Sequence, residues 1–446
     1  MRVALTTLGC KLNATETSAI ERRFAAMGHE IVEYGQPADL LVVNTCTVTE
    51  AADVECRKVV RKGLRAAPEA RVVVTGCYAQ LKPDAVLSID GVSAVVGTAS
   101  KISIPEMADT IMQSPVPLRM VQPLDGQTLF APARSSRVNT RTRAFLKVQD
   151  GCDYSCSFCT IPKARGPSRV MTLSDVRQEL TAIAREGFHE CVVSGINLGE
   201  YADAGGSRMI DLLHMIEAMD LPYRVRLGSI EPNTISDGII EFLASSRTIV
   251  PHFHIPLQSG SDEILRRMRR RYNSTMYRSV VEKIIGRIPD AAVGIDVITG
   301  FPGETDHHAR QTEQFLADLP WAYLHVFTYS ERADTDATLM GGSVDVATRR
   351  ERTRRLRQMS QQRTIEFHRA NIGHVRTFLP EGYEAEYGCW TGWTENHVAV
   401  RLPGEPEMQK RPISVRLVCE DGAALRAEVL DETSIEQPSL AEQVKT

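Results

Sequence analysis

The chain has 446 residues, of which 43% are hydrophobic and 24% are charged. This balance is typical of a globular protein and excludes a chain that is mainly disordered, collagen-like or coiled-coil. The formal net charge of −4 excludes a protein that coats nucleic acid through overall positive charge, but a local basic surface is still allowed. No apolar run approaches the roughly 18 residues of a membrane-spanning helix, and the N-terminal stretch turns polar at Lys11. We therefore expect a cytoplasmic protein that has no membrane partner.

The first 112 residues have the pattern of a parallel sheet that is covered on both faces. The expected strands and helices are, in chain order, 3–8, 15–27, 40–44, 48–65 and 72–75. Continuous Val and Leu runs that alternate with helices are typical of such a buried sheet. We therefore predict a Rossmann-like or flavodoxin-like α/β domain over residues 1–112. The following segment, 113–143, contains four prolines and carries four arginines towards its end, and we expect a linker there.

From residue 144 onward, strands and helices alternate about six times. The expected strands are 144–148, 190–194, 224–228, 252–255, 292–298 and 322–327. Consecutive β–α units predict a partial (β/α)6 barrel of the TIM type, with its active site at the carboxyl ends of the strands. We place this barrel at 144–371, including a long arginine-rich helix over 345–371. Short alternating strands over 373–432 predict a small all-β barrel or sandwich, and 433–446 is a polar tail.

Three cysteines follow the first expected barrel strand with the spacing C-x3-C-x2-C. They are Cys152, Cys156 and Cys159. Three thiolates on one tight loop suit a four-iron cluster, which has four corners and so keeps one iron open for a small chelating ligand. Structural zinc is the alternative, but it prefers four closed ligands, and no fourth ligand is close in sequence. The spacing therefore favours an iron–sulfur cluster at the barrel mouth.

A second group of cysteines lies in the N-terminal domain. Cys10, Cys46 and Cys77 each follow an expected strand by one or two residues. In a parallel sheet these positions would meet at the carboxyl edge, where ligand sites form. Most free cysteines are buried apolar residues, but three at equivalent places predict a second cluster with an open iron.

The two groups together resemble a known family. The barrel loop resembles the radical S-adenosylmethionine (SAM) superfamily. The segments that resemble methylthiotransferases are 9–13, 44–48, 75–77, 149–152 and 161–166, and residues 392–397 resemble the core of a TRAM domain. The resemblance implies an N-terminal cluster domain, a radical SAM barrel and a C-terminal TRAM domain. It also implies two [4Fe-4S] clusters, SAM, and insertion of a methylthio group at an unactivated carbon.

The resemblance also assigns roles to the six cysteines. Cys152, Cys156 and Cys159 would bind the cluster that cleaves SAM to a 5′-deoxyadenosyl radical. Cys10, Cys46 and Cys77 would bind the cluster that carries the sulfur, and all six thus count as metal-binding and catalytic residues. An electron donor such as flavodoxin or ferredoxin is implied, whereas the sulfur donor is not identified by the sequence.

The first cysteine loop bears on the substrate. Lys11-Leu12, with Glu16-Thr17, is most similar to the branch that acts on N6-threonylcarbamoyladenosine at tRNA position 37. The partner would be a tRNA anticodon stem-loop. The alternatives are isopentenyladenosine in tRNA, a ribosomal protein, and, outside the enzymes, a zinc-dependent RNA-binding protein without catalytic activity. A threonylcarbamoyl pocket should offer a cation, for which Arg165 and Arg332 are candidates.

Polar or glycine residues stand at or after the expected barrel strands. They are Gly195, Asn197, Ser229, Glu231, Gln258 and Asp296. These positions resemble family segments that line the SAM and substrate pocket, so we predict contacts with the cofactor or substrate. Each could equally be an ordinary loop or capping residue.

Four further features have a structural and a functional interpretation. His252 and His254 would share one face of a strand, but no carboxylate is close in sequence, so hydrogen bonding is expected in place of metal binding. Asp334 stands where the family usually has glycine, which suggests a backbone shape that Asp adopts at some cost.

Three arginine-rich runs, 134–169, 266–271 and 349–357, are either solvated helix faces or a phosphate-binding surface. In the last domain, Trp390 or Trp393 could stack on a base.

Overall fold

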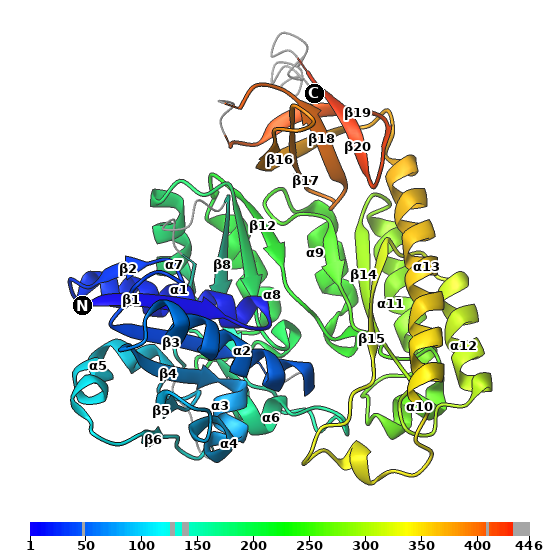
Figure 1. The fold of residues 1–446 in the computed structure, drawn as a ribbon. Coiled ribbons are helices and arrows are strands. Elements are labelled where there is room, and N and C mark those ends of the chain that lie inside the picture. Colours follow the sequence, from blue (N-terminus) through cyan, green and yellow to red (C-terminus); the bar gives the residue numbers. More distant parts are fainter. Residues whose placement is uncertain (47–49, 125–129, 136–141, 407–409, 431–446) are drawn as a thin grey trace.

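The protein was examined as a computed structural model, which describes residues 1–446 apart from 47–49, 125–129, 136–141, 407–409 and 431–446 (Figure 1). An N-terminal sheet domain lies beside a central open barrel, and a small β barrel lies at one end of the central barrel (Figure 1). Among the described helices, none has the length and apolar character needed to cross a membrane.

The N-terminal domain is built on a six-stranded parallel sheet. In spatial order its strands are β2 (Glu30–Val32), β1 (Arg2–Thr7), β3 (Leu40–Thr45), β4 (Arg71–Gly76), β5 (Val92–Val96) and β6 (Leu118–Met120). The helices are α1 (Lys11–Ala26), α2 (Glu50–Ala66), α3 (Cys77–Leu81), α4 (Pro83–Leu87) and α5 (Ile104–Gln113). Alternate strand residues pack on opposite faces: Leu40 and Val42 pack with α1 and α5, whereas Leu41 and Val43 pack with α2, α3 and α4. This explains the unbroken apolar runs.

The segment expected to be a linker contributes to both neighbouring sheets. Residues 118–120 form β6 at the edge of the N-terminal sheet. The two-residue strand β7 (Ala133–Arg134) pairs antiparallel with the first barrel strand. The connection is therefore anchored at both ends, and the domain boundaries within it stay predictions.

The central barrel has six parallel strands, as expected. They are β8 (Arg143–Lys147), β11 (Glu190–Ser194), β12 (Arg224–Leu227), β13 (His252–His254), β14 (Ala292–Thr299) and β15 (Tyr323–Thr328). Two bridges, Val225 with Ile249 and Ser229 with His254, join the sheet β12-β11-β8-β7 to the sheet β13-β14-β15. The outer helices are α7 (Leu173–Arg185), α8 (Met209–Ala218), α9 (Asp237–Ser245), α10 (Asp262–Arg267), α11 (Ser274–Arg287) and α12 (Asp306–Ala317). The barrel is open between β7 and β15, the two ends of this strand order (Figure 1).

Side-chain alternation separates an apolar outer face of the barrel from a polar inner face. Phe253, Val293 and Ile295 belong to the apolar core that also contains the helices. His254 and Asp296 occupy alternate positions on the same strands and therefore point the other way. The inner face of β13 and β14 is thus available for a site.

The C-terminal part consists of one long helix and a closed β barrel. Helix α13 (Val346–Ala370) packs along β15 and leads to the small barrel (Figure 1). The barrel order is β16 (Val375–Glu384), β17 (Cys389–Thr394), β18 (Ala399–Pro403), β20 (Ala424–Val429) and β19 (Ile413–Asp421). Of the two predicted alternatives, barrel and sandwich, the structure shows the barrel. Its core includes Phe378, Trp390 and Val400.

Candidate functional site

The three barrel cysteines lie around one cavity. Cys152, Cys156 and Cys159 line a space of about 430 Å³, which is also bordered by the short helix α6 (Ile161–Arg165), by Arg269 and by residues 334–336. Gly151 allows the chain to turn into this loop: its φ is +75°, and an added Cβ would lie 2.0 Å from the carbonyl oxygen of Pro167. The local sequence therefore brings the three thiols together as the spacing predicted.

Each of the three sulfur atoms accepts one hydrogen bond. The backbone N–H of Tyr154 donates to Cys152 Sγ, and that of Ile161 donates to Cys159 Sγ, both at 3.4 Å. Arg270 Nη1 donates to Cys156 Sγ at 3.1 Å. Burial raises the pKa of Cys152 to about 11 and that of Cys159 to about 12. These raised pKa values favour the protonated thiols at neutral pH, and binding of a metal would displace the protons.

Arg270 links the cysteine loop to Glu231, which follows β12. Its guanidinium also forms an ion pair with the Glu231 carboxylate, and both side chains are largely buried. Burial raises the pKa of Glu231, although Arg270 opposes the shift. Glu231 is a predicted pocket residue, whereas in the sequence Arg270 is only one member of an arginine-rich run. A contact across 114 positions has no local signal.

The N-terminal cysteines meet at the carboxyl edge of their sheet. Cys10 and Cys46 follow the neighbouring strands β1 and β3, and Cys77 follows β4 as the first residue of α3. Asn13 Nδ2 donates to the Leu8 and Thr45 carbonyls at 3.1 and 2.9 Å. This amide ties the first loop to the second, as the parallel-sheet argument required.

The two cysteine groups are held close to each other by direct packing of their helices. Helix α3, which begins at Cys77, packs against α6, which begins two residues after Cys159. Thr98 Oγ1 donates to the Ala164 carbonyl of α6 at 2.8 Å. Both groups therefore border the same contact between the N-terminal domain and the barrel.

A buried network of charged side chains fills this contact. Its members are Glu16, Lys101, Lys147, Asp150 and Arg165, none more than 4% exposed. Glu16 accepts from Lys147 Nζ at 2.9 Å and from Arg165 Nη1 at 3.0 Å, and it also pairs with Lys101. Burial opposes ionisation of Glu16, but these cations hold its pKa well below the ordinary range. Three cations against two carboxylates leave one excess positive charge beside Cys77, which favours an anionic group there.

The remaining predicted pocket residues have definite surroundings. Gly195 packs on Gln149, whose Oε1 would lie 2.6 Å from an added Cβ, so close packing accounts for this glycine. Asn197 is buried, and its side-chain amide interacts with Tyr154 and Glu200. A contact of this residue with SAM or a substrate stays a prediction.

Ser229 and Gln258 lie beside the polar inner face. Ser229 forms a β-bridge with His254, and Gln258 forms one with Val297. The backbone of Gln258 is left-handed, with φ +68°. The buried Gln258 Oε1 lacks a partner among the described residues. Contacts of these residues with SAM or a substrate stay predictions.

Several expectations about cations and aromatic residues need correction. Arg165 is completely buried and bonded to Glu16, Asp150 and Asn13, so it is not available to a substrate. Trp390 is 4% exposed and its Nε1 donates to the Glu405 carbonyl, so it is a core residue that cannot stack on a base.

Some arginines of the arginine-rich runs are used inside the protein, whereas others, such as Arg350 and Arg357, are exposed. Arg352 is buried and pairs with Glu304 and Asp306. Arg267 donates to the Pro302 and Gly341 carbonyls. These side chains stabilise the fold, and the phosphate-binding surface suggested by the runs is correspondingly smaller.

Comparison with known proteins agrees with this architecture. Residues 2–97 match the family model described as uncharacterized protein family UPF0004, and residues 146–316 match the radical SAM superfamily. The chain is 36% identical to the threonylcarbamoyladenosine tRNA methylthiotransferase MtaB of Bacillus subtilis, over 93% of each chain. It is 32% identical to the MtaB protein of Aquifex aeolicus, over 92% of this chain and 98% of the relative.

The chain belongs to the MtaB family. A tRNA-2-methylthio-N(6)-dimethylallyladenosine synthase of Mycobacterium bovis is 32% identical over 83% of this chain and 74% of that protein. Among solved structures, the radical SAM methyltransferase TsrM of Kitasatospora setae has a TM-score of 0.56 at 15% identity, covering 73% and 72% of the two chains. That likeness shows the shared fold.

MtaB proteins are radical SAM enzymes that use SAM and two [4Fe-4S] clusters. The donor sets of this chain fit that requirement. Each group offers three thiols, which leaves one corner of a four-iron cluster open. The hydrogen bonds to the barrel sulfurs and the excess positive charge beside Cys77 suit anionic clusters.

Proposed function

We propose that this MtaB-family enzyme replaces the C2 hydrogen of N6-threonylcarbamoyladenosine at tRNA position 37 with a methylthio group. The observation that carries the proposal is the convergence of two three-cysteine groups on one contact between α3 and α6. One group lines the barrel cavity, and the other lies at the sheet edge beside it. Radical formation and sulfur delivery need two such neighbouring sites.

The chain's own residues hold and tune the groups that supply the chemistry. Cys152, Cys156 and Cys159 would bind the cluster that, with SAM, supplies the hydrogen-abstracting radical, and Cys10, Cys46 and Cys77 would bind the sulfur-carrying cluster. Arg270 orients Cys156 and keeps Glu231 at the barrel mouth. The part of the barrel where SAM would bind is lined by Asn197, Ser229 and Gln258, and Gly195 packs against Gln149 there. These residue roles rest on placement and on Gln258 Oε1, which has no hydrogen-bond partner among the described residues.

The polar inner wall of the barrel supports threonylcarbamoyl over isopentenyl as the substituent. The inner positions of β13, β14 and β15 carry His252, His254, Asp296, Tyr323 and His325. A threonylcarbamoyl group has a carboxylate and a hydroxyl that can form hydrogen bonds with such a wall, whereas an isopentenyl group offers it no hydrogen-bonding atom. The greater coverage of the MtaB relatives points the same way.

The physiological setting follows from the same proposal. The RNA partner would be the anticodon stem-loop that carries the modified adenosine. The electron donor would be a small redox protein such as flavodoxin or ferredoxin, in the cytoplasm.

Iron analysis tests the two cluster sites. Anaerobically prepared protein should contain about eight irons per chain, four for each cluster. The Cys152→Ala/Cys156→Ala/Cys159→Ala variant should lose about half of this iron and all SAM cleavage. The Cys10→Ala/Cys46→Ala/Cys77→Ala variant should lose the other half and still cleave SAM. A matched Cys56→Ala/Cys389→Ala/Cys419→Ala variant should keep both clusters. Stoichiometric zinc without sulfide would instead support the non-catalytic RNA-binding alternative.

Nucleoside analysis tests the substrate. Purified enzyme would be incubated with anticodon stem-loops that carry either threonylcarbamoyladenosine or isopentenyladenosine, and the nucleosides would be measured by mass spectrometry. We expect a 2-methylthio product from the first RNA and on the order of 10⁴-fold less from the second, because unpaired buried polar groups reject an apolar substituent. A product from the isopentenyl RNA alone would contradict the proposed substrate.

A further inference from the structure

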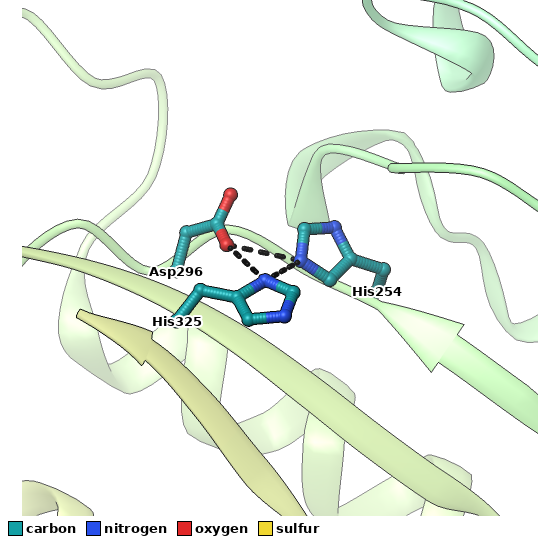
Figure 2. Close-up of side chains that lie close together, drawn as sticks. All are labelled: His254, Asp296 and His325. Carbon is teal, nitrogen blue, oxygen red and sulfur yellow. Dashed lines mark hydrogen bonds and ion pairs between the residues drawn. The ribbon is translucent and has the colours of Figure 1, made fainter. Parts of the chain in front are cut away.

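Three side chains from neighbouring strands converge on the inner wall of the central barrel. His254 ends β13, Asp296 lies in β14, and His325 lies in β15 directly opposite Asp296 in the strand register. Figure 2 shows the two imidazole rings turned towards the carboxylate. The exposed fraction of the side chain is 17% for His254, 20% for Asp296 and 53% for His325. The cluster is therefore partly buried and still reachable from the barrel opening.

The three facing atoms form a nearly equilateral triangle. His254 Nε2 lies 3.0 Å from Asp296 Oδ1 and 3.2 Å from His325 Nδ1, and His325 Nδ1 lies 3.1 Å from the same Oδ1 (Figure 2). These atoms come from positions 42 and 29 residues away from Asp296 along the chain. No carboxylate is close to His254 in the sequence, because its partner Asp296 lies on the next strand.

Hydrogen bonding alone does not satisfy this triangle. The ionised carboxylate only accepts, and each ring nitrogen either donates or accepts. If both nitrogens carry hydrogens, the two N–H groups face each other along the 3.2 Å edge. If one nitrogen lacks its hydrogen, its lone pair faces the lone pairs of Oδ1. A cation near the centre attracts all three atoms at once.

The dimensions of the triangle suit a transition metal ion. Zinc–nitrogen and zinc–oxygen bonds are about 2.1 Å, and with edges near 3.1 Å an ion at that distance would have ligand–metal–ligand angles of about 95°. Such angles are usual when three protein ligands occupy one face of the ion and further positions stay open. We propose that His254, Asp296 and His325 bind one divalent transition metal ion, separate from the two clusters, with its open positions towards the barrel interior.

The electrostatics of the wall agree with a cation. Burial disfavours the charge of Asp296, but hydrogen bonds from His254 and His325 bring its pKa down to about 2, so the carboxylate is ionised at neutral pH. Two imidazoles and one carboxylate are ligands that zinc and ferrous iron accept well. His252, the other histidine of this strand face, donates to or accepts from Tyr323 Oη at 2.8 Å and stays outside the triangle.

The open positions define the ligand class of the ion. This step rests on the proposed function. A threonylcarbamoyl substituent brings a carboxylate, and a carboxylate oxygen is a suitable further ligand for the ion. Arg165 is buried and bonded elsewhere, and the ion would supply a cation for this substituent.

Metal analysis of the intact enzyme tests the site. Anaerobic holoenzyme with both clusters would be washed with chelator, desalted and titrated with Zn²⁺, and zinc and iron would be counted by mass spectrometry. Because the cluster cysteines are occupied by iron, we expect one zinc per chain with the iron content unchanged. In His254→Asn/His325→Asn and in Asp296→Asn, zinc affinity should fall at least about tenfold, since loss of a ligand costs more than loss of a supporting contact.

The matched control removes two exposed histidines elsewhere on the described surface. His214→Asn/His307→Asn should bind zinc like the unaltered chain. Absence of stable zinc in the unaltered holoenzyme, or equal zinc affinity in the two double variants, would overturn the site and leave the proposed function standing.

A second measurement tests the ligand class. Free N6-threonylcarbamoyladenosine nucleoside should bind the zinc-loaded holoenzyme at least about tenfold more tightly than the zinc-free form, because a charged, partly buried pair gains a coordination bond. If the nucleoside binds equally to both forms although the zinc-loaded form retains its zinc, the substrate carboxylate is not a ligand of the ion. The metal site itself would then still stand.

Discussion

At the scale of single residues, backbone shape decides whether the cysteine loops can close. Gly9 has φ +108°, and a Cβ at this position would lie 2.3 Å from Cys46 Cβ and 2.7 Å from its Sγ. The first loop can therefore approach the second only through glycine. Asp334 has φ +69°, a left-handed backbone that the glycine usual in the family would adopt without cost. Asp is among the few residues that tolerate this region.

The first prediction is that Gly9→Ala removes the N-terminal cluster. Alanine disfavours this φ and would push Cys46 away from Cys10, so we expect about half of the iron to be lost while SAM cleavage continues. Iron and sulfide content and 5′-deoxyadenosine formation measure the two effects. Gly28→Ala is the control, because Gly28 also has a positive φ of +81° but no heavy atom within 4 Å of the added Cβ. Full iron content in Gly9→Ala would contradict the argument.

At the scale of elements, α1 joins the cysteine loop to the barrel. One turn of this helix carries Asn13, which fastens the loops, and the next carries Glu16, which meets Lys147 and Arg165 from the barrel. A buried ion network of this kind is weak proof of stability in itself, but breaking it leaves charges without partners. The orientation of the two cysteine groups therefore depends on one carboxylate of α1.

The second prediction is that Glu16→Gln destabilises the contact between the N-terminal domain and the barrel by about 3–5 kcal/mol. The substitution leaves Lys101, Lys147 and Arg165 with Asp150 as their remaining carboxylate. Thermal and urea unfolding measure the loss. Glu106→Gln, which removes an exposed ion pair with Arg23, should cost less than about 1 kcal/mol.

The same network predicts a pH dependence. The pKa values of Glu16 and Asp150 are lowered by their cations against the opposing effect of burial. A lowered carboxyl pKa contributes stability above its ordinary value, near pH 4 to 5, and this contribution is lost as the pH falls towards the folded pKa. The unaltered protein should therefore lose stability below about pH 4.5, and Glu16→Gln should show a shallower loss. If the stability of the two proteins falls equally with decreasing pH, the buried network is not the source of the pH dependence.

At the scale of the whole molecule, the small β barrel is fixed at the end of the central barrel away from the cysteine loop. Arg224, at the start of β12, donates to the Thr377 carbonyl at 2.7 Å and to the Trp393 carbonyl at 3.1 Å. The fully buried Asn396 donates to the Asp290 carbonyl at 3.1 Å and to Asn371 Oδ1 at 2.9 Å. These bonds set the direction in which the small barrel would meet RNA.

The third prediction is that Asn396→Ala loosens this attachment. Buried carbonyl and amide groups would lose their donor, at a cost of about 1–3 kcal/mol. We expect faster proteolysis near residues 371–375 and weaker RNA binding, whereas iron content and SAM cleavage should not change. Glu386→Ala, in an exposed turn of the same barrel, should alter none of these. Loss of SAM cleavage in Asn396→Ala would mean that the two ends of the barrel are coupled.

The sequence by itself determined the strand order along the chain, the six cysteines, their grouping and the family, because these depend on local periodicity and spacing. The tertiary structure decided which distant side chains meet. Arg270 reaches Cys156, Arg165 disappears into the network with Glu16, and His254, Asp296 and His325 form a triangle. No local pattern encodes these contacts, because strand register and barrel curvature place residues from separate strands within bonding distance.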